Sequence, residues 1–121
     1  ENPDKSAAKL CHELKTEQVS KLSIIINDSA GRAWRNGSIG FAIGTNGFEV
    51  VENMVGHRDL YDREMVVTEV AVADELAAAA SFLMGQADES APVVLIRGAQ
   101  TKPSNEGSAA LIREKNKDLF R

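Results

Sequence analysis

Two continuous apolar runs dominate the hydrophobic pattern of this chain. Residues 24–26 are three isoleucines at the end of a predicted strand over 19–27, and residues 92–97 read Pro-Val-Val-Leu-Ile-Arg. Neither run alternates with polar positions, so each predicts a strand that is buried on both faces. We expect the two strands to lie in one sheet.

A third region, residues 38–54, has the pattern of a β-hairpin. Apolar and polar positions alternate over 39–43 and again over 48–52, and the residues between them are Gly-Thr-Asn-Gly. The Asn-Gly pair is a strong short-range hairpin signal, so the turn is expected at Asn46 and Gly47. The glycines at 37, 40, 44 and 47 indicate bulges, or a backbone that another segment approaches closely.

Helical spacing of apolar residues predicts two main helices. The first covers residues 6–16 and has one apolar face, with His12 off the apolar stripe. The longest helix is expected over 69–84, with Thr68 as its N-cap and Gly85 as its stop. This alanine-rich segment is apolar nearly all round, which predicts that it is buried.

Two acids, Asp74 and Glu75, interrupt the apolar character of the long helix. Acids are rarely buried without a partner, so one is expected on an exposed stripe and the other beside an arginine or a metal. A short closing helix is expected over 109–113. The order of elements predicts an α+β fold, in which a mixed or antiparallel sheet with a hairpin packs against the long buried helix and shorter terminal helices.

Composition and charge narrow the class of protein. The 121 residues are 43% hydrophobic and 26% charged, which is typical of one globular domain, here 1–121. The net charge of −4 argues against a nucleic-acid partner, and the apolar runs are too short to cross a membrane. Cys11 is the only cysteine and no secretory signal is present, so the cytoplasm is the expected compartment.

The residues that follow the isoleucine run offer candidate chemistry. Asp28 and Ser29 supply a carboxylate and a hydroxyl, oxygen ligands suited to Mg²⁺ or Mn²⁺. Arg32 and Arg35 supply two planar guanidinium groups that can grip phosphate or carboxylate. The alternative interpretation is that Asp28 and Ser29 only turn the chain and that both arginines are solvated.

A second polar loop, residues 55–65, allows two interpretations. It contains His57, Arg58, Arg63 and several acids within a few positions. These groups either form local ion pairs in a solvated loop or face a substrate, because functional side chains concentrate on loops. The roles of His57, Arg58 and Arg63 stay open at this point.

Several segments together resemble the coenzyme F-420-0:γ-glutamyl ligases. Residues 27–37, Asn-Asp-Ser-Ala-Gly-Arg-Ala-Trp-Arg-Asn-Gly, are similar to the family segment S-D-T-F-G-R-P-W-R-N-G. The similarity continues, in the same order along the chain, at 42–44, 67–80, 84–88, 93–98, 107–109, 111–113 and 118–121. It therefore covers nearly the whole chain.

The resemblance implies a GTP-dependent carboxylate–amine ligase. Its substrates would be a deazaflavin precursor and L-glutamate, with Mn²⁺ or Mg²⁺ as cofactor and a homodimer as the assembly. It implies that Asp28, Ser29 and Gln86 bind metal and that Arg32 and Arg35 are catalytic. It also implies a loop that binds the nucleotide and comprises Met84, Gly85, Gln86, Ala87, Asp88, Glu89, Ser90 and Ala91.

The sequence also departs from the family pattern. Ala30 and Ala33 replace the usual Phe and Pro, and Ser29 replaces a Thr. Family members are substantially longer, so we expect the chain to be a fragment that lacks an N-terminal part of the nucleotide and metal site and is inactive alone. The alternative hypothesis is a non-catalytic binding or dimerisation domain that keeps the same fold.

Overall fold

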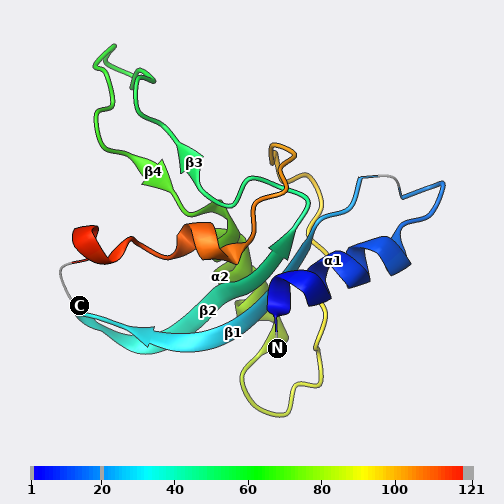
Figure 1. The fold of residues 1–121 in the computed structure, drawn as a ribbon. Helices are drawn as coiled ribbons and strands as arrows, with labels where there is room; N and C mark the ends of the chain where they lie inside the picture. The colour runs from blue at the N-terminus through cyan, green and yellow to red at the C-terminus, as the bar shows by residue number, and fades with distance from the viewer. Residues whose placement is uncertain (1, 20, 119–121) are drawn as a thin grey trace.

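The computed structural model describes residues 2–19 and 21–118 (Figure 1). Its order of elements mixes helices and antiparallel strands, which confirms an α+β arrangement. The helices are α1 (Pro3–Leu14) and α2 (Val72–Met84), with 3₁₀ turns η1 (Ser108–Leu111) and η2 (Lys115–Lys117) near the end of the chain. The strands are β1 (Ile24–Arg32), β2 (Arg35–Asn46), β3 (Glu52–Asn53) and β4 (Glu69–Val70).

A long curved hairpin of β1 and β2 forms the centre of the molecule (Figure 1). Its turn lies at Ala33 and Trp34, because Arg32 pairs with Arg35, so the prediction of a turn at Asn46 and Gly47 is wrong. The strand predicted to end at Asn27 continues to Arg32, so Asp28 and Ser29 lie within β1 and do not turn the chain. Backbone pairing extends the hairpin beyond the core, where the β1 side chains from Asp28 onward are exposed.

The first helix is capped at the sequence Asn-Pro-Asp. The Asn2 side-chain oxygen accepts the Lys5 amide at 3.0 Å, and Pro3 occupies the first turn, where its missing N–H costs nothing. The helix therefore begins earlier than the predicted range of 6–16. Ala7 and Cys11 are its buried residues.

The second helix is shorter and less buried than predicted. Residues 69 and 70 form β4, and α2 begins at Val72 and stops at Gly85, whose φ is 77°. Only Ala73, Ala77 and Ser81 of this helix are buried, whereas Phe82 is 86% exposed and Leu83 is 65% exposed. The prediction of a helix buried on all sides is not confirmed, because α2 packs against the hairpin on one side only.

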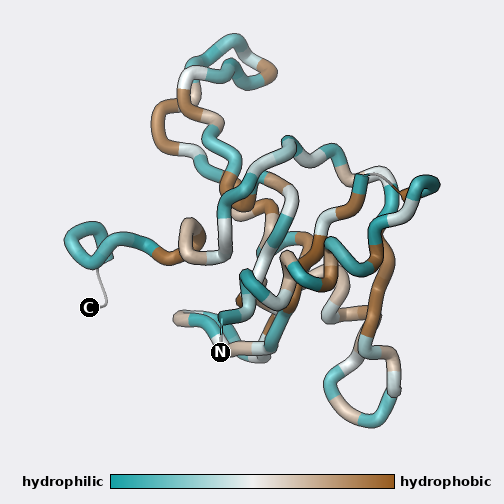
Figure 2. Tube along the Cα trace, turned by 45° about the vertical axis from the view of Figure 1, so that its right-hand side comes forward, coloured by the Kyte–Doolittle hydropathy of each residue, from teal (hydrophilic) through white to brown (hydrophobic). Residues whose placement is uncertain are grey.

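The core is small and lies between the hairpin and α2. Its buried members are Ala42, Phe48, Val50, Ala73 and Ala77. Gly40 allows β2 to lie close to α2, because a Cβ atom at this position would lie 2.6 Å from Ser81 Cβ and 2.7 Å from Ala77 O. Apolar positions lie in the middle of the molecule and also on outlying segments (Figure 2).

The apolar run at residues 92–97 is not a strand in the structure. The described chain forms two separate sheets, β1–β2 and β3–β4, and neither includes this run. Val93 is 83% exposed and Leu95 is 67% exposed. The prediction of a second buried strand in the same sheet as the first is therefore wrong, since no strand of the described chain pairs with this run.

Candidate functional site

The polar part of β1 passes the end of α2, and a cleft of about 160 Å³ lies between them. Asp28 and Ser29 line this cleft together with Gln86, although these residues are far apart in the sequence. The complete lining is Asn27, Asp28, Ser29, Ser81, Met84, Gly85 and Gln86. The hairpin and the helix thus bring together the three residues that the sequence suggested as oxygen ligands.

Strand alternation sets how β1 contributes to this cleft. Asn27 and Ser29 fall on the same face as Ile25, which packs on the core, whereas Asp28 falls on the alternate face. The side-chain nitrogen of Asn27 donates to Ala77 O at 3.3 Å and lies 3.7 Å from Met84 Sδ. The Asp28 carboxylate lies at the rim and accepts the Ser29 amide at 2.7 Å.

Gln86 contributes from the other side of the cleft. Its side-chain nitrogen donates to Ser81 Oγ at 2.9 Å, and Ser81 is buried in the last turns of α2. Because the amide nitrogen is engaged, the carbonyl oxygen is the atom that Gln86 offers to a ligand.

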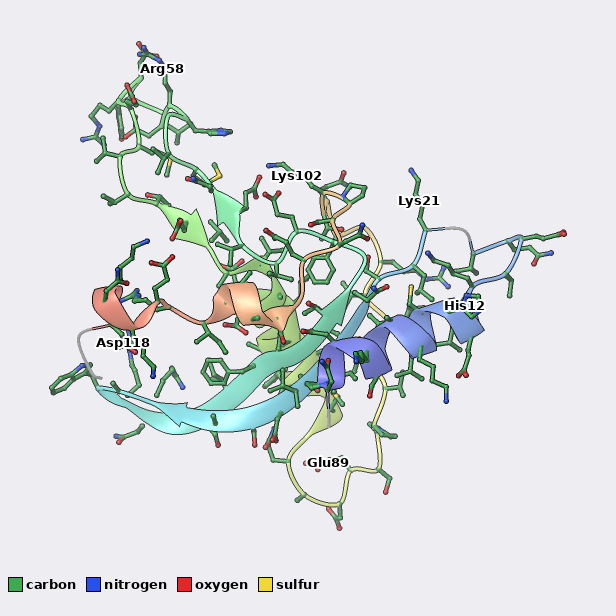
Figure 3. All side chains as sticks on the ribbon, in the orientation of Figure 1. His12, Lys21, Arg58, Glu89, Lys102 and Asp118 are labelled. Carbon is green, nitrogen blue, oxygen red and sulfur yellow. The ribbon has the colours of Figure 1, made fainter. Side chains whose placement is uncertain are left out.

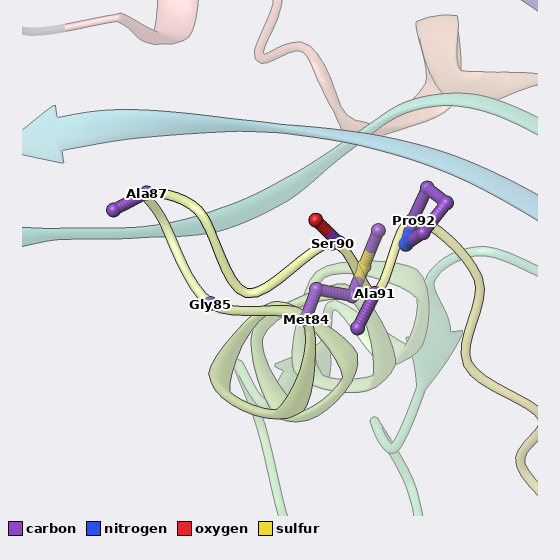
Figure 4. A pocket seen from close by; sticks show the side chains of 6 residues that line it. All are labelled: Met84, Gly85, Ala87, Ser90, Ala91 and Pro92. Carbon is purple, nitrogen blue, oxygen red and sulfur yellow. The ribbon is translucent and has the colours of Figure 1, made fainter.

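A larger hollow of about 390 Å³ lies beside the cleft (Figure 4). It shares Met84 and Gly85 with the cleft and is otherwise lined by Ala87, Ser90, Ala91 and Pro92. The hollow is therefore mostly apolar, and the ligand-type oxygens belong to the cleft. Most of the loop that the resemblance assigns to the nucleotide lies around these two spaces.

The two arginines do not line the cleft. Arg32 and Arg35 are paired at the hairpin turn, about 13 Å along β1 from Asp28 at the usual rise of a strand. Arg32 donates to Gly37 O at 3.3 Å, and both arginines are exposed. Within the described residues, the structure therefore does not bring them to the proposed metal ligands.

The polar loop over 55–65 also lies away from the cleft. Arg58 is at the end of a projecting arm, and Glu89 lies at the opposite side of the molecule (Figure 3). Arg58 pairs with Asp62 at 2.9 Å, and Arg63 pairs with Asp59 at 2.7 Å. The geometry supports the interpretation of a solvated loop held by local ion pairs.

The acids of α2 also have local explanations. Asp74 Oδ1 accepts the Ala42 amide of β2 at 2.9 Å, so the partner that the structure shows is backbone, and no arginine of the described chain forms an ion pair with it. Glu75 is exposed, as predicted for one of the two.

Comparison with known proteins decides the family. A family model described as F420-0:Gamma-glutamyl ligase matches residues 1–98. The chain belongs to this family. It is 46% identical over 120 residues to the Coenzyme F420:L-glutamate ligase of Methanocaldococcus jannaschii, a match that covers 99% of this chain and 48% of the relative.

Other relatives of the same name give similar values. The protein of Methanothermobacter thermautotrophicus is 45% identical over 122 residues, and that of Methanopyrus kandleri is 42% identical over 125 residues. These matches cover 99% and 100% of this chain but only 48% and 50% of the relatives. This ligase-family chain thus spans about half the length of the curated relatives it matches.

The donors of the cleft fit part of a hard-cation site in a ligase. Asp28, Ser29 and Gln86 offer a carboxylate, a hydroxyl and a carbonyl oxygen, the ligand types that Mg²⁺ and Mn²⁺ accept. Over residues 2–19 and 21–118, no group of three or more His, Cys, Asp or Glu side chains could share a metal ion. One carboxylate and two neutral oxygens are fewer ligands than an octahedral ion needs.

Two cleft residues escape prediction from the sequence. Asn27 is the last residue of the predicted strand, and its place directly before Asp28 was the available signal. Ser81 is the single hydroxyl-bearing residue of α2, and its position one turn before Gly85 is the available signal.

No helix among the described residues combines the length and hydrophobicity needed to span a bilayer.

Proposed function

We propose that this chain contributes to a ligase that joins L-glutamate, through an amide bond, to the deazaflavin precursor of coenzyme F-420. Membership of the ligase family and the names of its relatives support the reaction class. The observation that carries the proposal is the cleft, where Asp28 and Ser29 of β1 meet Gln86. Because the chain spans half the length of these relatives, the complete activity is a proposal.

GTP is the proposed source of energy. A carboxylate oxygen of the precursor attacks the γ-phosphorus and GDP leaves; the glutamate amine then attacks the acyl carbon, releasing inorganic phosphate and a proton. Since phosphoryl transfer depends mainly on positioning and on charge stabilisation, the protein must hold the nucleotide close to the acceptor. The loop formed by residues 84–91 is the proposed nucleotide-binding segment.

Asp28, Ser29 and Gln86 would hold a divalent cation beside this loop. The cation would neutralise charge on the phosphate oxygens. The Asp28 carboxylate would bind the ion in place of its hydrogen bond from the Ser29 amide. Gln86 would bind the ion through its carbonyl oxygen, because its side-chain nitrogen donates to Ser81. Phosphate oxygens, water or further protein groups would complete the shell.

Arg32 and Arg35 keep a narrower proposed role. Their guanidinium groups are exposed at the hairpin turn, so they would act on a phosphate or carboxylate that reaches this turn. A homodimer also stays a prediction that rests on the family resemblance.

Replacement of Asp28 by asparagine tests the cation site. We expect Asp28→Asn to weaken Mn²⁺ binding, measured by calorimetry with and without GTP, by about tenfold or more, because loss of even an outer-shell partner costs 10–100-fold in metal affinity. Asp28 is exposed, so the melting temperature should stay close to that of the wild type.

Asp62→Asn is the matched control, because Asp62 is an exposed aspartate on the distant arm. It should leave Mn²⁺ affinity unchanged. Equal Mn²⁺ affinity in the wild type and Asp28→Asn would show that Asp28 is only a strand residue and would remove the proposed cation site.

A further inference from the structure

The loop after α2 is folded tightly around one side chain. Gly85 ends the helix with φ 77° and ψ −179°. A Cβ atom at this position would overlap the Glu89 carboxyl group, so the glycine admits Glu89 as well as the backbone turn. Glu89 is therefore packed back against the end of the helix that it follows.

The carboxylate of Glu89 is occupied by the loop itself. Its Oε2 atom accepts the Ala87 amide at 2.8 Å. Bonds from the amides of Ala87, of Glu89 itself and of Gln86 hold the pKa of this carboxyl below its ordinary value, although burial alone would raise it. Several N–H groups that converge on one anion form a nest, and here the anion belongs to the loop.

Glu89 lines neither of the two spaces at this site. Ala87 and Ser90, on either side of it, line the larger hollow, and Gln86 lines the cleft. The residue thus lies within the proposed nucleotide loop while its charged group turns inward to the loop backbone. A direct ligand would present its carboxylate to the cleft or to the hollow.

We propose that Glu89 is a positioning residue that closes residues 85–89 on themselves and so holds Gln86 at the cleft. The inference rests on the proposed function, because it assigns Gln86 to a cation. Gln86 then has two anchors: Ser81 fixes its side-chain amide, and the Glu89 carboxylate fixes the backbone beside it. Replacement of Glu89 removes the bond that holds the loop backbone beside Gln86 and leaves the Asp28 side of the cleft unchanged.

The first readout is hydrogen exchange at the Ala87 amide in the full chain without metal. Glu89→Ala should speed this exchange by about tenfold or more, because a charge-assisted hydrogen bond is lost. Glu89→Gln keeps an acceptor oxygen and should restore most of the protection. Glu106→Ala, at an exposed glutamate of another loop, is the matched control and should leave Ala87 exchange unchanged.

The second readout is Mn²⁺ affinity in a double-mutant cycle of Glu89→Ala and Gln86→Ala. If Glu89 acts through Gln86, the double variant binds Mn²⁺ as weakly as Gln86→Ala alone. Additive losses would show that Glu89 is itself a ligand and would overturn the inference. Tighter binding of GTP or inorganic phosphate by Glu89→Ala would also overturn it, because Glu89 would then be blocking an anion site.

The two readouts separate the inference from the proposed function. Unchanged Ala87 exchange in Glu89→Ala refutes the loop closure whatever the metal does. Unchanged Mn²⁺ affinity in both Asp28→Asn and Gln86→Ala refutes the cation site, and with it the positioning role for that ion.

Discussion

Asp4 joins three segments that are distant in the sequence, and its replacement should destabilise the whole fold. Its Oδ1 atom, in the first turn of α1, accepts the Thr45 amide of β2 at 2.8 Å and the Ser108 amide of η1 at 3.0 Å. The Ser108 hydroxyl donates its single proton to Ile43 O at 2.9 Å. The two amides are therefore the protein donors to the Asp4 carboxylate.

The expected cost follows from these bonds. Hydrogen bonds to charged groups contribute about 1.5–3 kcal/mol each, and a buried donor left unsatisfied costs about 1–3 kcal/mol. Thr45 is only 1% exposed, so water cannot readily replace the carboxylate at its amide. Because the two bonds share one oxygen and are not additive, Asp4→Ala should lower the free energy of unfolding by about 2–4 kcal/mol. Asp4→Asn keeps an acceptor oxygen and should cost about half as much.

The same bonds make the stability depend on pH. Burial alone would raise the pKa of Asp4, but the amides of Ser108 and Thr45 lower it below its ordinary value of 3.8. A depressed pKa means that the unfolded chain binds the proton more readily, so this contribution is present above the unfolded pKa. It is lost as the pH falls from about 5 through the folded pKa.

Urea unfolding followed by circular dichroism, at pH 7 and at steps down to pH 3, measures both effects. Wild type should lose stability over the acidic steps more steeply than Asp4→Ala. Glu13→Gln is the control in the same helix, since its ion pair with Lys9 is exposed and 3.9 Å long, and it should change stability by less than about 0.5 kcal/mol. A difference of under about 0.5 kcal/mol between wild type and Asp4→Ala at pH 7 would refute the reasoning.

Three further substitutions probe the hairpin. Gly40→Ala should lower the free energy of unfolding, measured in urea melts, by about 1–3 kcal/mol, because the new Cβ meets the α2 backbone. Gly31→Ala is the control and should be nearly neutral, because a Cβ there has nothing within 4 Å. Equal effects of the two substitutions would contradict the close packing of Gly40 on α2. Trp34→Asn should stabilise the protein by up to about 1 kcal/mol in thermal melts. Trp34 is 91% exposed and has a φ of 65°, a conformation that Asn tolerates better. Lower stability of the variant would show that the indole ring contributes contacts.

The sequence predicted local structure where a local signal decides it. The stop of α2 at Gly85 is correct, because a positive φ there favours glycine. The strand around the isoleucines and the end of β2 near Asn46 also follow from local pattern. The hairpin turn was misplaced because Asn46 and Gly47 carry the stronger signal, while the true turn uses Ala33 and Trp34, which few hairpins would select.

Burial was predicted less well because it depends on neighbours. An apolar run indicates only that burial of its side chains would be favourable. The side chains become buried only where another surface of the protein packs against them. Residues 92–97 pair with no strand of the described chain and keep exposed side chains, and α2 meets the hairpin on one side. The same reasoning explains Asp74, whose acceptor role at the Ala42 amide depends on a strand that crosses the helix.

The location of the cleft follows from where the polar half of β1 leaves the core. Ile25 packs on the core, and two residues later Asn27 still faces α2 but bonds to its backbone and to Met84. β2 carries an extra residue, Ile43, opposite the step from Ile26 to Asn27, so the ladder changes register at the point where the side chains change from apolar to polar. A strand of a two-stranded sheet also keeps one edge unpaired, so groups on both its faces can reach the end of a neighbouring helix. This explains how three consecutive residues, which alternate in direction, line one cleft with a glutamine held by the loop after α2.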